Sequence, residues 1–282
     1  MAERTRVNLR SAGKARLGQN FLASQSAAED IVNSLGDVSH SQVVEIGPGR
    51  GALTQALVKK AAHVIAIELD RGLAAELRLA YSHQRNLEVL EGDVLTIDFR
   101  AVLRPAGSLT DLPPLEPEPV HLIGNLPYYI TSDILLRLFE FHDQFDRMVI
   151  MVQREVADRI AAKPGSRDYG LLSATCQLYT RVEKLFTLPP GAFSPPPKVH
   201  STVLRLQVAP RFKDLGVPAK EFIDFLKLAF GMKRKTLVNN LKSRYVPEEI
   251  KTALEFAGVR ADIRAEAVTI EKSAEIFRRL HT

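Results

Sequence analysis

The sequence predicts an α/β protein with a mostly parallel sheet, followed by a small all-α domain. Short apolar runs alternate with helical patterns as far as about Val156, and this alternation is typical of a parallel sheet. Beyond Pro210 every periodic segment has the spacing of a helix. The chain has 282 residues, 45% of them hydrophobic, which is enough for one large and one small domain.

The first half of the chain predicts four strands. Residues 1–22 form an arm, and residues 23–35 have the pattern of a helix. The buried strands are expected at 43–46, 63–67, 87–90 and 120–123, with a helix over 52–58 after the first of them.

The second half predicts a fifth strand at 147–152, which leads into a helix over 153–160. After a turn at Lys163-Pro164-Gly165-Ser166, another helix is expected over 169–179. Two strands, 182–188 and 202–208, flank a Pro-rich loop. Ala209-Pro210 divides domain 1–210 from domain 211–282, whose helices are expected at 220–230, 235–241, 247–257 and 270–280.

The most informative stretch is Gly124-Asn125-Leu126-Pro127-Tyr128-Tyr129, at the end of the fourth strand. The Asn125 side chain can accept a hydrogen bond from an exocyclic amine. Pro127 lacks an N–H and restricts Leu126, so the neighbouring carbonyls can point into a site. Tyr128 offers a flat face to a base. These groups can together hold the amino group of an adenine. The alternative is a strand that simply ends in a proline turn.

Three other strands end in residues suited to a nucleoside cofactor. The first leads into a G-x-G-x-G turn that contains Gly47 and Gly49, where a ligand can approach the backbone closely. The second ends in Glu68, which can accept hydrogen bonds from ribose hydroxyls. The third leads to Asp93, which can receive an adenine amine. Open α/β sheets bind ligands at strand carboxyl ends, so these groups predict one site.

Taken together, these motifs closely resemble those of the bacterial small-subunit (16S) ribosomal RNA adenine N6,N6-dimethyltransferases. The resemblance covers almost the whole chain. It is carried by Leu17-Gly18-Gln19-Asn20-Phe21-Leu22, Glu45-Ile46-Gly47-Pro48-Gly49-Arg50-Gly51, Glu68-Leu69-Asp70, Gly92-Asp93, Gly124-Asn125-Leu126-Pro127-Tyr128, Val152-Gln153-Arg154-Glu155-Val156-Ala157, Phe193-Ser194-Pro195-Pro196-Pro197-Lys198-Val199 and Arg234-Lys235-Thr236-Leu237. The Pro-rich segment 104–119 is longer than usual, which we expect to alter a surface loop and not the chemistry.

The resemblance implies a Rossmann-like class I methyltransferase fold, with S-adenosylmethionine as cofactor. The expected reaction is dimethylation of the N6 amines of two adjacent adenosines in the 3′-terminal hairpin loop of 16S rRNA. The cofactor-binding residues would be Asn20, Leu22, Gly47, Gly49, Glu68, Asp93 and Asn125. The catalytic residues would be Asn125, Leu126, Pro127, Tyr128 and Phe193. Phe193 and Tyr128 would clamp the adenine, although the Pro-rich loop around Phe193 can also be read as a stiff connector.

Positive charge is concentrated at the two ends of the chain. The net charge is +5, but residues 1–22 carry +4, residues 211–282 carry +5 and the middle carries −4. This distribution predicts an RNA footprint around a less basic catalytic core. The expected phosphate contacts are Arg16 with the other basic residues of the arm (Arg4, Arg6, Arg10 and Lys14), Lys198, and the cluster Lys233, Arg234 and Lys235. The alternative for each cluster is a solvated surface.

Composition limits the remaining possibilities. The single cysteine allows no disulfide within the chain, and Cys176 lies among leucines on a predicted core helix, so we interpret it as a packed thiol. The histidines lack metal-ligand spacing, so no metal is expected. No apolar run could cross a membrane. We expect a cytoplasmic monomer that acts on 16S rRNA within an immature small ribosomal subunit.

Two other functions are compatible with these motifs. One is a related enzyme that methylates a large-subunit rRNA adenine and confers antibiotic resistance, against which Pro195-Pro196-Pro197-Lys198-Val199 and the C-terminal R-K-T-L argue. The other is a nucleic-acid-binding factor that keeps the fold without catalysis. The intact Gly47, Glu68, Asp93 and Asn125 argue against it.

Overall fold

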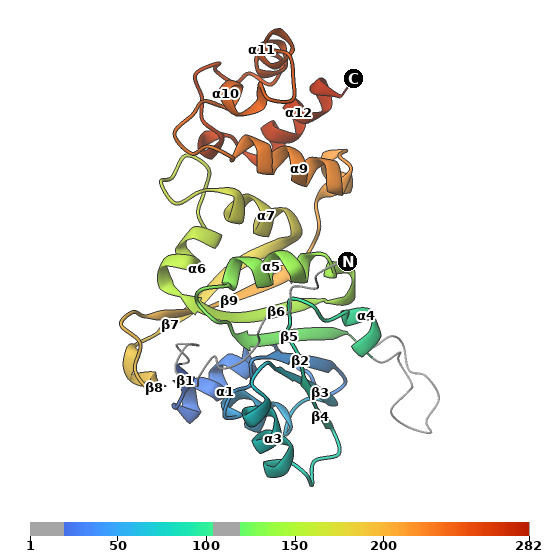
Figure 1. Ribbon diagram of the computed structural model, residues 1–282, viewed down its shortest axis with the longest axis vertical. Helices are drawn as coiled ribbons and strands as arrows, with labels where there is room; N and C mark the ends of the chain where they lie inside the picture. Colours follow the sequence, from blue (N-terminus) through green and yellow to red (C-terminus); the bar gives the residue numbers. More distant parts are fainter. Residues whose placement is uncertain (1–19, 104–118, 282) are drawn as a thin grey trace, which may run out of the picture.

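The computed structural model describes residues 20–103 and 119–281 of the chain. Its centre is a seven-stranded sheet in the order β4-β3-β2-β5-β6-β9-β7 (Figure 1). The first five strands of this order run parallel, β9 is antiparallel to β6, and β7 is antiparallel to β9. The strands are β2 (Gln42–Ile46), β3 (His63–Glu68), β4 (Leu87–Glu91), β5 (Val120–Asn125), β6 (Arg147–Gln153), β7 (Thr180–Leu188) and β9 (Ser201–Val208).

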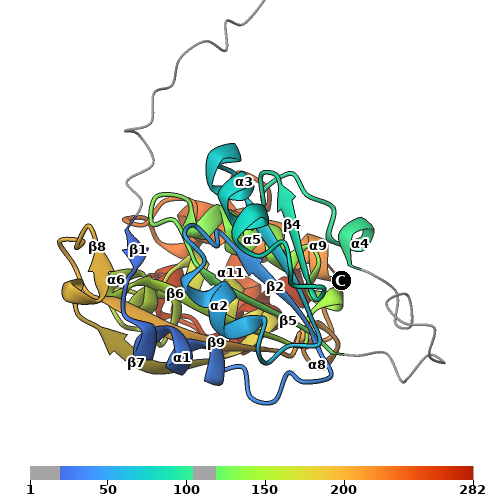
Figure 2. The same ribbon diagram turned by 90° about the horizontal axis from the view of Figure 1, so that it is seen from below.

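Helices cover both faces of the sheet, because successive strand residues point to opposite sides. Val43, Val64 and Ile123 face one side, in a core shared with α1 and α2. Val44 and Ile65 face the other, in a core shared with α4 to α7. Figure 2 shows the layers from below. These helices are α1 (Gln25–Asn33), α2 (Ala52–Leu57), α3 (Arg71–Ala80), α4 (Phe99–Val102), α5 (Thr131–Phe139), α6 (Arg154–Ile160) and α7 (Leu171–Tyr179).

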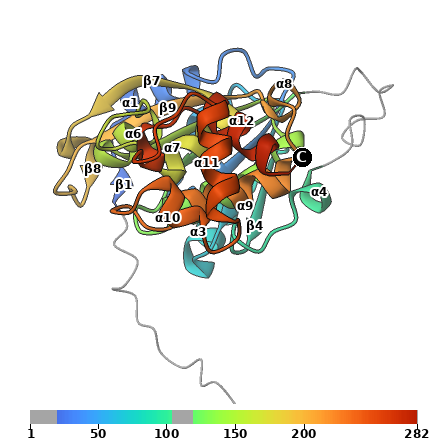
Figure 3. The ribbon, with the colours of Figure 1, turned by 90° about the horizontal axis from the view of Figure 1, so that it is seen from above.

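The C-terminal part is helical, as the sequence predicts. It contains α8 (Phe212–Leu215), α9 (Ala219–Ala229), α10 (Leu237–Leu241), α11 (Pro247–Phe256) and α12 (Ile270–Leu280) (Figure 3). Its hydrophobic core also includes Tyr169, Ala174 and Leu178, which belong to α7 and the segment before it. The helical part is therefore packed onto α7, and a division of the chain at residue 210 stays a prediction.

Element boundaries move by a few residues from the predicted ones. The first helix is shorter than 23–35, because the hydroxyl of Ser24 accepts a hydrogen bond from the Ala27 N–H and begins α1 at Gln25. Gln153, predicted to be helical, is the last residue of β6 and the N-cap of α6. Three short 3₁₀ helices, at His142–Gln144, Pro190–Ala192 and Ala265–Ala267, were also not predicted.

A second, two-stranded sheet joins distant segments. β1 (Phe21–Leu22) pairs antiparallel with β8 (Phe193–Ser194), with Leu22 opposite Phe193. The backbone N–H of Ala23 also donates to the carbonyl of Ala192 at 2.8 Å. The end of the N-terminal arm is thus attached to the Pro-rich loop. In the described part of the chain, no helix is long and apolar enough to cross a membrane.

Candidate functional site

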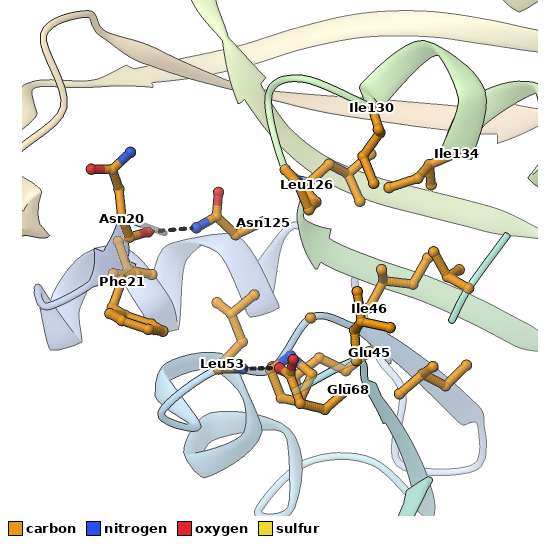
Figure 4. Close-up of a pocket in the computed structure, with 18 of the residues that line it drawn as sticks. Asn20, Phe21, Glu45, Ile46, Leu53, Glu68, Asn125, Leu126, Ile130 and Ile134 are labelled. Carbon is orange, nitrogen blue, oxygen red and sulfur yellow. Dashed lines mark hydrogen bonds between the residues drawn. The ribbon is translucent and has the colours of Figure 1, made fainter. Parts of the chain in front are cut away.

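A cavity of about 400 Å³ opens at the carboxyl ends of β2, β3 and β5, where the sequence predicts a ligand site (Figure 4). It brings together most of the predicted cofactor-binding and catalytic side chains. The residues that line it are Asn20, Phe21, Leu22, Glu45, Ile46, Gly47, Pro48, Gly49, Arg50, Ala52, Leu53, Ile67, Glu68, Leu69, Gly92, Asp93, Val94, Asn125, Leu126, Pro127, Tyr128, Tyr129, Ile130 and Ile134.

The turn after β2 needs glycine at Gly49. Its φ is +57°, in the left-handed region that favours glycine, and a Cβ there would lie 2.9 Å from the Phe21 ring. The Gly49 N–H donates to Oε2 of Glu68 at 3.0 Å. The glycine turn therefore contacts both the segment that covers the cavity and the acid at the end of β3.

The carboxylate of Glu68 is fixed on both oxygens. Only 3% of the residue is exposed. Besides the bond from Gly49 to Oε2, the Asp70 N–H donates to Oε1 at 2.9 Å. Asp93 is fixed in a similar way, since its Oδ1 accepts from the Leu95 N–H at 2.9 Å. Both acids accept hydrogen bonds from backbone N–H groups and line the cavity, as their positions at the carboxyl ends of β3 and β4 predict.

Asn125 is oriented by a residue far away in sequence. Its Nδ2 donates to the carbonyl of Asn20 at 3.1 Å, which leaves Oδ1 without a hydrogen-bond partner in the described residues (Figure 4). The next residue, Leu126, donates its N–H to the Met151 carbonyl at 3.0 Å. The amide oxygen of Asn125 is therefore an oriented acceptor at the cavity.

Tyr128 and Phe193 are placed differently from one another. Tyr128 lines the cavity, and its hydroxyl lies 2.7 Å from Oγ of Ser201. Phe193 does not line it, because the β1–β8 pairing turns this side chain into the core around Leu22, where only 4% is exposed. The two rings are not brought together around the cavity, and a contact between Phe193 and a base stays a prediction.

A family model for ribosomal RNA adenine dimethylase matches residues 10–282 of the chain. The chain belongs to this family. Its sequence is 60% identical, over 274 residues, to ribosomal RNA small subunit methyltransferase A of Koribacter versatilis, which covers 97% of this chain and 96% of the relative. It is 51% identical over 268 residues to the protein of the same name from Acidobacterium capsulatum, with 95% and 91% covered.

Solved structures show the same architecture. A dimethyladenosine transferase from Plasmodium falciparum superposes with a TM-score of 0.74 at 24% identity, over 93% of this chain and 97% of that one. The 23S rRNA methyltransferase ErmE superposes with a TM-score of 0.65 at 26% identity, over 93% and 100%. The prediction of a Rossmann-like class I methyltransferase fold is confirmed, and family membership gives S-adenosylmethionine as the cofactor.

Glu45 is a buried residue that lines the cavity and was not predicted from the sequence. Burial raises the pKa of its carboxyl to about 7, against the opposing hydrogen bond from Thr54. The Thr54 hydroxyl donates to Oε2 at 2.6 Å. A glutamate inside the apolar run that precedes the glycine turn was the available signal, since an isolated charge in a buried strand is costly. Burial therefore favours the protonated form of Glu45 more than that of an exposed glutamate.

Two further missed residues lie at the rim of the cavity. Leu69 follows Glu68 and is 53% exposed, and Tyr129 follows Tyr128 and is 63% exposed. Large exposed apolar groups at a cavity mouth are typical of a surface that a ligand covers. The signal was their position, since each comes directly after a predicted site residue.

The predicted RNA-binding residues lie outside the cavity. Lys198, Lys233, Arg234 and Lys235 are all exposed, and none forms an ion pair with another residue in the described ranges. Arg16 and the other basic residues of the arm fall outside the described residues. In Figure 1, α10, which follows the Lys233–Lys235 cluster, lies near the upper end of the long axis, whereas β1 and β8 lie in its lower half.

Proposed function

We propose that this chain uses S-adenosylmethionine to dimethylate the N6 amines of two adjacent adenosines in the 3′-terminal hairpin loop of 16S rRNA. The observation that supports this most is the convergence of Asn125, Glu68 and Asp93 at one cavity in a member of the adenine dimethylase family. The small-subunit relatives at 60% and 51% identity support the choice of RNA.

The cavity residues fit the parts of the cofactor. The Glu68 carboxylate, fixed by two backbone N–H groups, is suited to accept hydrogen bonds from both ribose hydroxyls. Asp93 would receive the adenine amine, between the apolar side chains of Leu69 and Val94. Asn20 and Leu22 would close over the cofactor, next to the backbone of Gly47. Donors and acceptors of the required kinds are thus present before the ligand binds.

Bound S-adenosylmethionine supplies an electrophilic methyl group. Oδ1 of Asn125 and a carbonyl near Leu126 would accept the two N6 hydrogens of the target adenine, which directs the nitrogen lone pair toward that methyl. Tyr128 would stack on the base, in a site that Pro127 helps to shape. The cofactor would supply the methyl group to the nitrogen and leave as S-adenosylhomocysteine, and the acidic ammonium-like amine would then lose its proton without a strong general base. Catalysis is therefore mainly positioning and electrostatics.

The wider assignment is also part of the proposal. The enzyme acts in the cytoplasm as a monomer on 16S rRNA in an immature small subunit, with no membrane partner. Residues 1–210 provide the catalytic domain, and residues 211–282 provide a helical RNA-binding domain. Phosphates are contacted by Arg16, Lys198, Lys233, Arg234 and Lys235. An adenine inside a duplex is inaccessible, so the target must lie in a loop or be flipped out.

The test is methyl transfer to purified ribosomal subunits that lack these modifications. Labelled S-adenosylmethionine is added with small or large subunits, and the modified nucleotides are mapped. We expect dimethyladenosine at two adjacent positions of the 16S rRNA 3′-terminal hairpin. Methylation of large-subunit RNA alone would favour the antibiotic-resistance activity instead. RNA binding without any transfer would favour a non-catalytic factor.

A further inference from the structure

Tyr128 is held by its hydroxyl as well as by its ring. The hydroxyl oxygen lies 2.7 Å from Oγ of Ser201, 73 residues further along the chain. Stacking on a base uses only the face of a ring, so phenylalanine would serve equally well for that purpose. The hydroxyl of Tyr128 therefore has a separate partner and a separate role.

Ser201 is a rigid anchor for this bond. It is fully buried and begins β9, where it pairs with Gln153 of β6 on one side and with Leu188 of β7 on the other. Its backbone is thus fixed by two strands of the sheet. Tyr128, in contrast, sits in the turn between β5 and α5, directly after Pro127, which has no N–H to donate. The hydrogen bond attaches a turn residue to the sheet.

We propose that Ser201 is a positioning residue of the methyl-transfer site, which fixes the plane of the Tyr128 ring against the target adenine. This inference rests on the function proposed above. Ser201 touches neither the cavity nor the reacting atoms, since it is absent from the cavity lining and acts through Tyr128.

The hydrogen bond between Tyr128 and Ser201 matters most for the second methyl transfer. In the first transfer the amine has two hydrogens, which Asn125 and the carbonyl near Leu126 can both hold. After one methyl is added only one hydrogen remains, so one of these hydrogen bonds is lost. The orientation of the monomethyl base then depends more on stacking, and a misplacement of about 1 Å can cost up to a hundredfold in rate.

The chain provides a matched control in the next residue. Thr202 is also buried, and its hydroxyl lies 2.9 Å from that of Thr187. Because side chains alternate along a strand, this pair lies on the opposite face from Ser201. Thr202→Val therefore removes an equally buried hydroxyl contact from the same strand without affecting Tyr128.

The experiment follows single-turnover methylation of undermethylated small subunits by Ser201→Ala, Tyr128→Phe, the double variant and Thr202→Val. Mono- and dimethyladenosine are resolved over time. We expect each single variant to slow the second transfer about tenfold, with a smaller effect on the first, so that monomethyladenosine accumulates. The double variant should be no slower than either single variant, because both remove the same interaction. Thr202→Val should give the wild-type product ratio.

A wild-type product ratio in Tyr128→Phe would overturn the proposal, and so would additive effects in the double variant. Tyr128→Phe removes a single oxygen, so it carries the test even where Ser201→Ala fails to fold. An equal accumulation of monomethyladenosine in Thr202→Val would assign the effect to general destabilisation and also reject the proposal. If the wild-type protein forms no dimethyladenosine, the proposed function itself fails, which is a separate result.

Discussion

Glu68 and Asn125 have their hydrogen-bonding directions set by the protein itself. The backbone N–H groups of Gly49 and Asp70 hold the Glu68 carboxylate, and the Asn20 carbonyl holds the Asn125 amide. A ligand that meets such groups need not order them, so less free energy is lost on binding. The same arrangement makes each side chain difficult to replace.

Glu68→Ala should weaken the binding of S-adenosylmethionine by about 1–3 kcal/mol, the usual cost of leaving buried hydrogen-bonding partners unsatisfied. Calorimetry measures this affinity directly. Glu91→Ala is the matched control, because Glu91 pairs with Glu68 in register but is exposed and lies outside the cavity lining. Equal affinities in the wild type and the Glu68 variant would reject the ribose contact.

Asn125→Ala should reduce methyl transfer by about a hundredfold or more, since it removes an oriented acceptor for the target amine. RNA affinity should change little, because Asn125 acts on one amine and not on the RNA surface. Since the variant also loses the bond to Asn20, single-turnover rates are measured at saturating cofactor. A near-normal rate under those conditions would disprove the role of Asn125 in holding the amine.

Among the helices and strands, local pattern placed the strands at 63–67 and 87–90 to within one residue. The first is a run of buried residues, as expected for a strand covered on both faces of a parallel sheet. The second, β4, is an edge strand whose residues are only partly buried, so its short apolar pattern alone marked it. The two-residue strands β1 and β8 have no periodicity to detect. Their pairing turns Phe193 into the core, so its orientation could not be read from the Pro-rich loop.

The residues of the cavity also differ in whether local sequence could place them there. Gly47, Glu68, Asp93 and Asn125 could be predicted, because each follows directly from its place at a strand end. The bond between Tyr128 and Ser201 depends on how β9 lies beside β6, which no local pattern specifies. Contacts of long sequence separation therefore had to come from the structure.

The glycine turn and β1 are close enough for one substitution to disturb both. Gly49→Ala should weaken cofactor binding about tenfold or more, roughly 1.4 kcal/mol, because its Cβ would displace Phe21 and disturb the N–H that binds Glu68. Gly165→Ala is the control, since its φ of +86° imposes similar backbone strain with no atom within 4 Å of the Cβ. Both should lower stability by about 1–2 kcal/mol. Equal cofactor affinities in the two variants would reject a role in cofactor binding for the close approach of Gly49 to Phe21.

Over the whole molecule, charge is distributed unevenly with respect to the cavity. Most of the residues that line the cavity belong to the segment of net charge −4, whereas the ends of the chain carry the positive excess. Lys198 and the cluster Lys233–Lys235 are exposed cations outside the cavity lining. In the function proposed above, phosphate contacts would position an RNA loop while base contacts would be made in the cavity.

Neutralising Arg234 and Lys235 together should weaken RNA binding and reduce its salt dependence, because each lost phosphate contact lowers the slope of log affinity against log salt by about one unit or less. Titration of RNA affinity against salt measures both quantities. The control neutralises Lys213 in α8 and Lys220 in the first turn of α9, which are both exposed and lie outside the predicted RNA-binding cluster. That pair removes the same charge and should leave the slope nearly unchanged. Equal slopes in all three proteins would mean that Arg234 and Lys235 are simply solvated. A weaker complex with an unchanged slope would instead assign this segment a packing role, because packing releases no counterions.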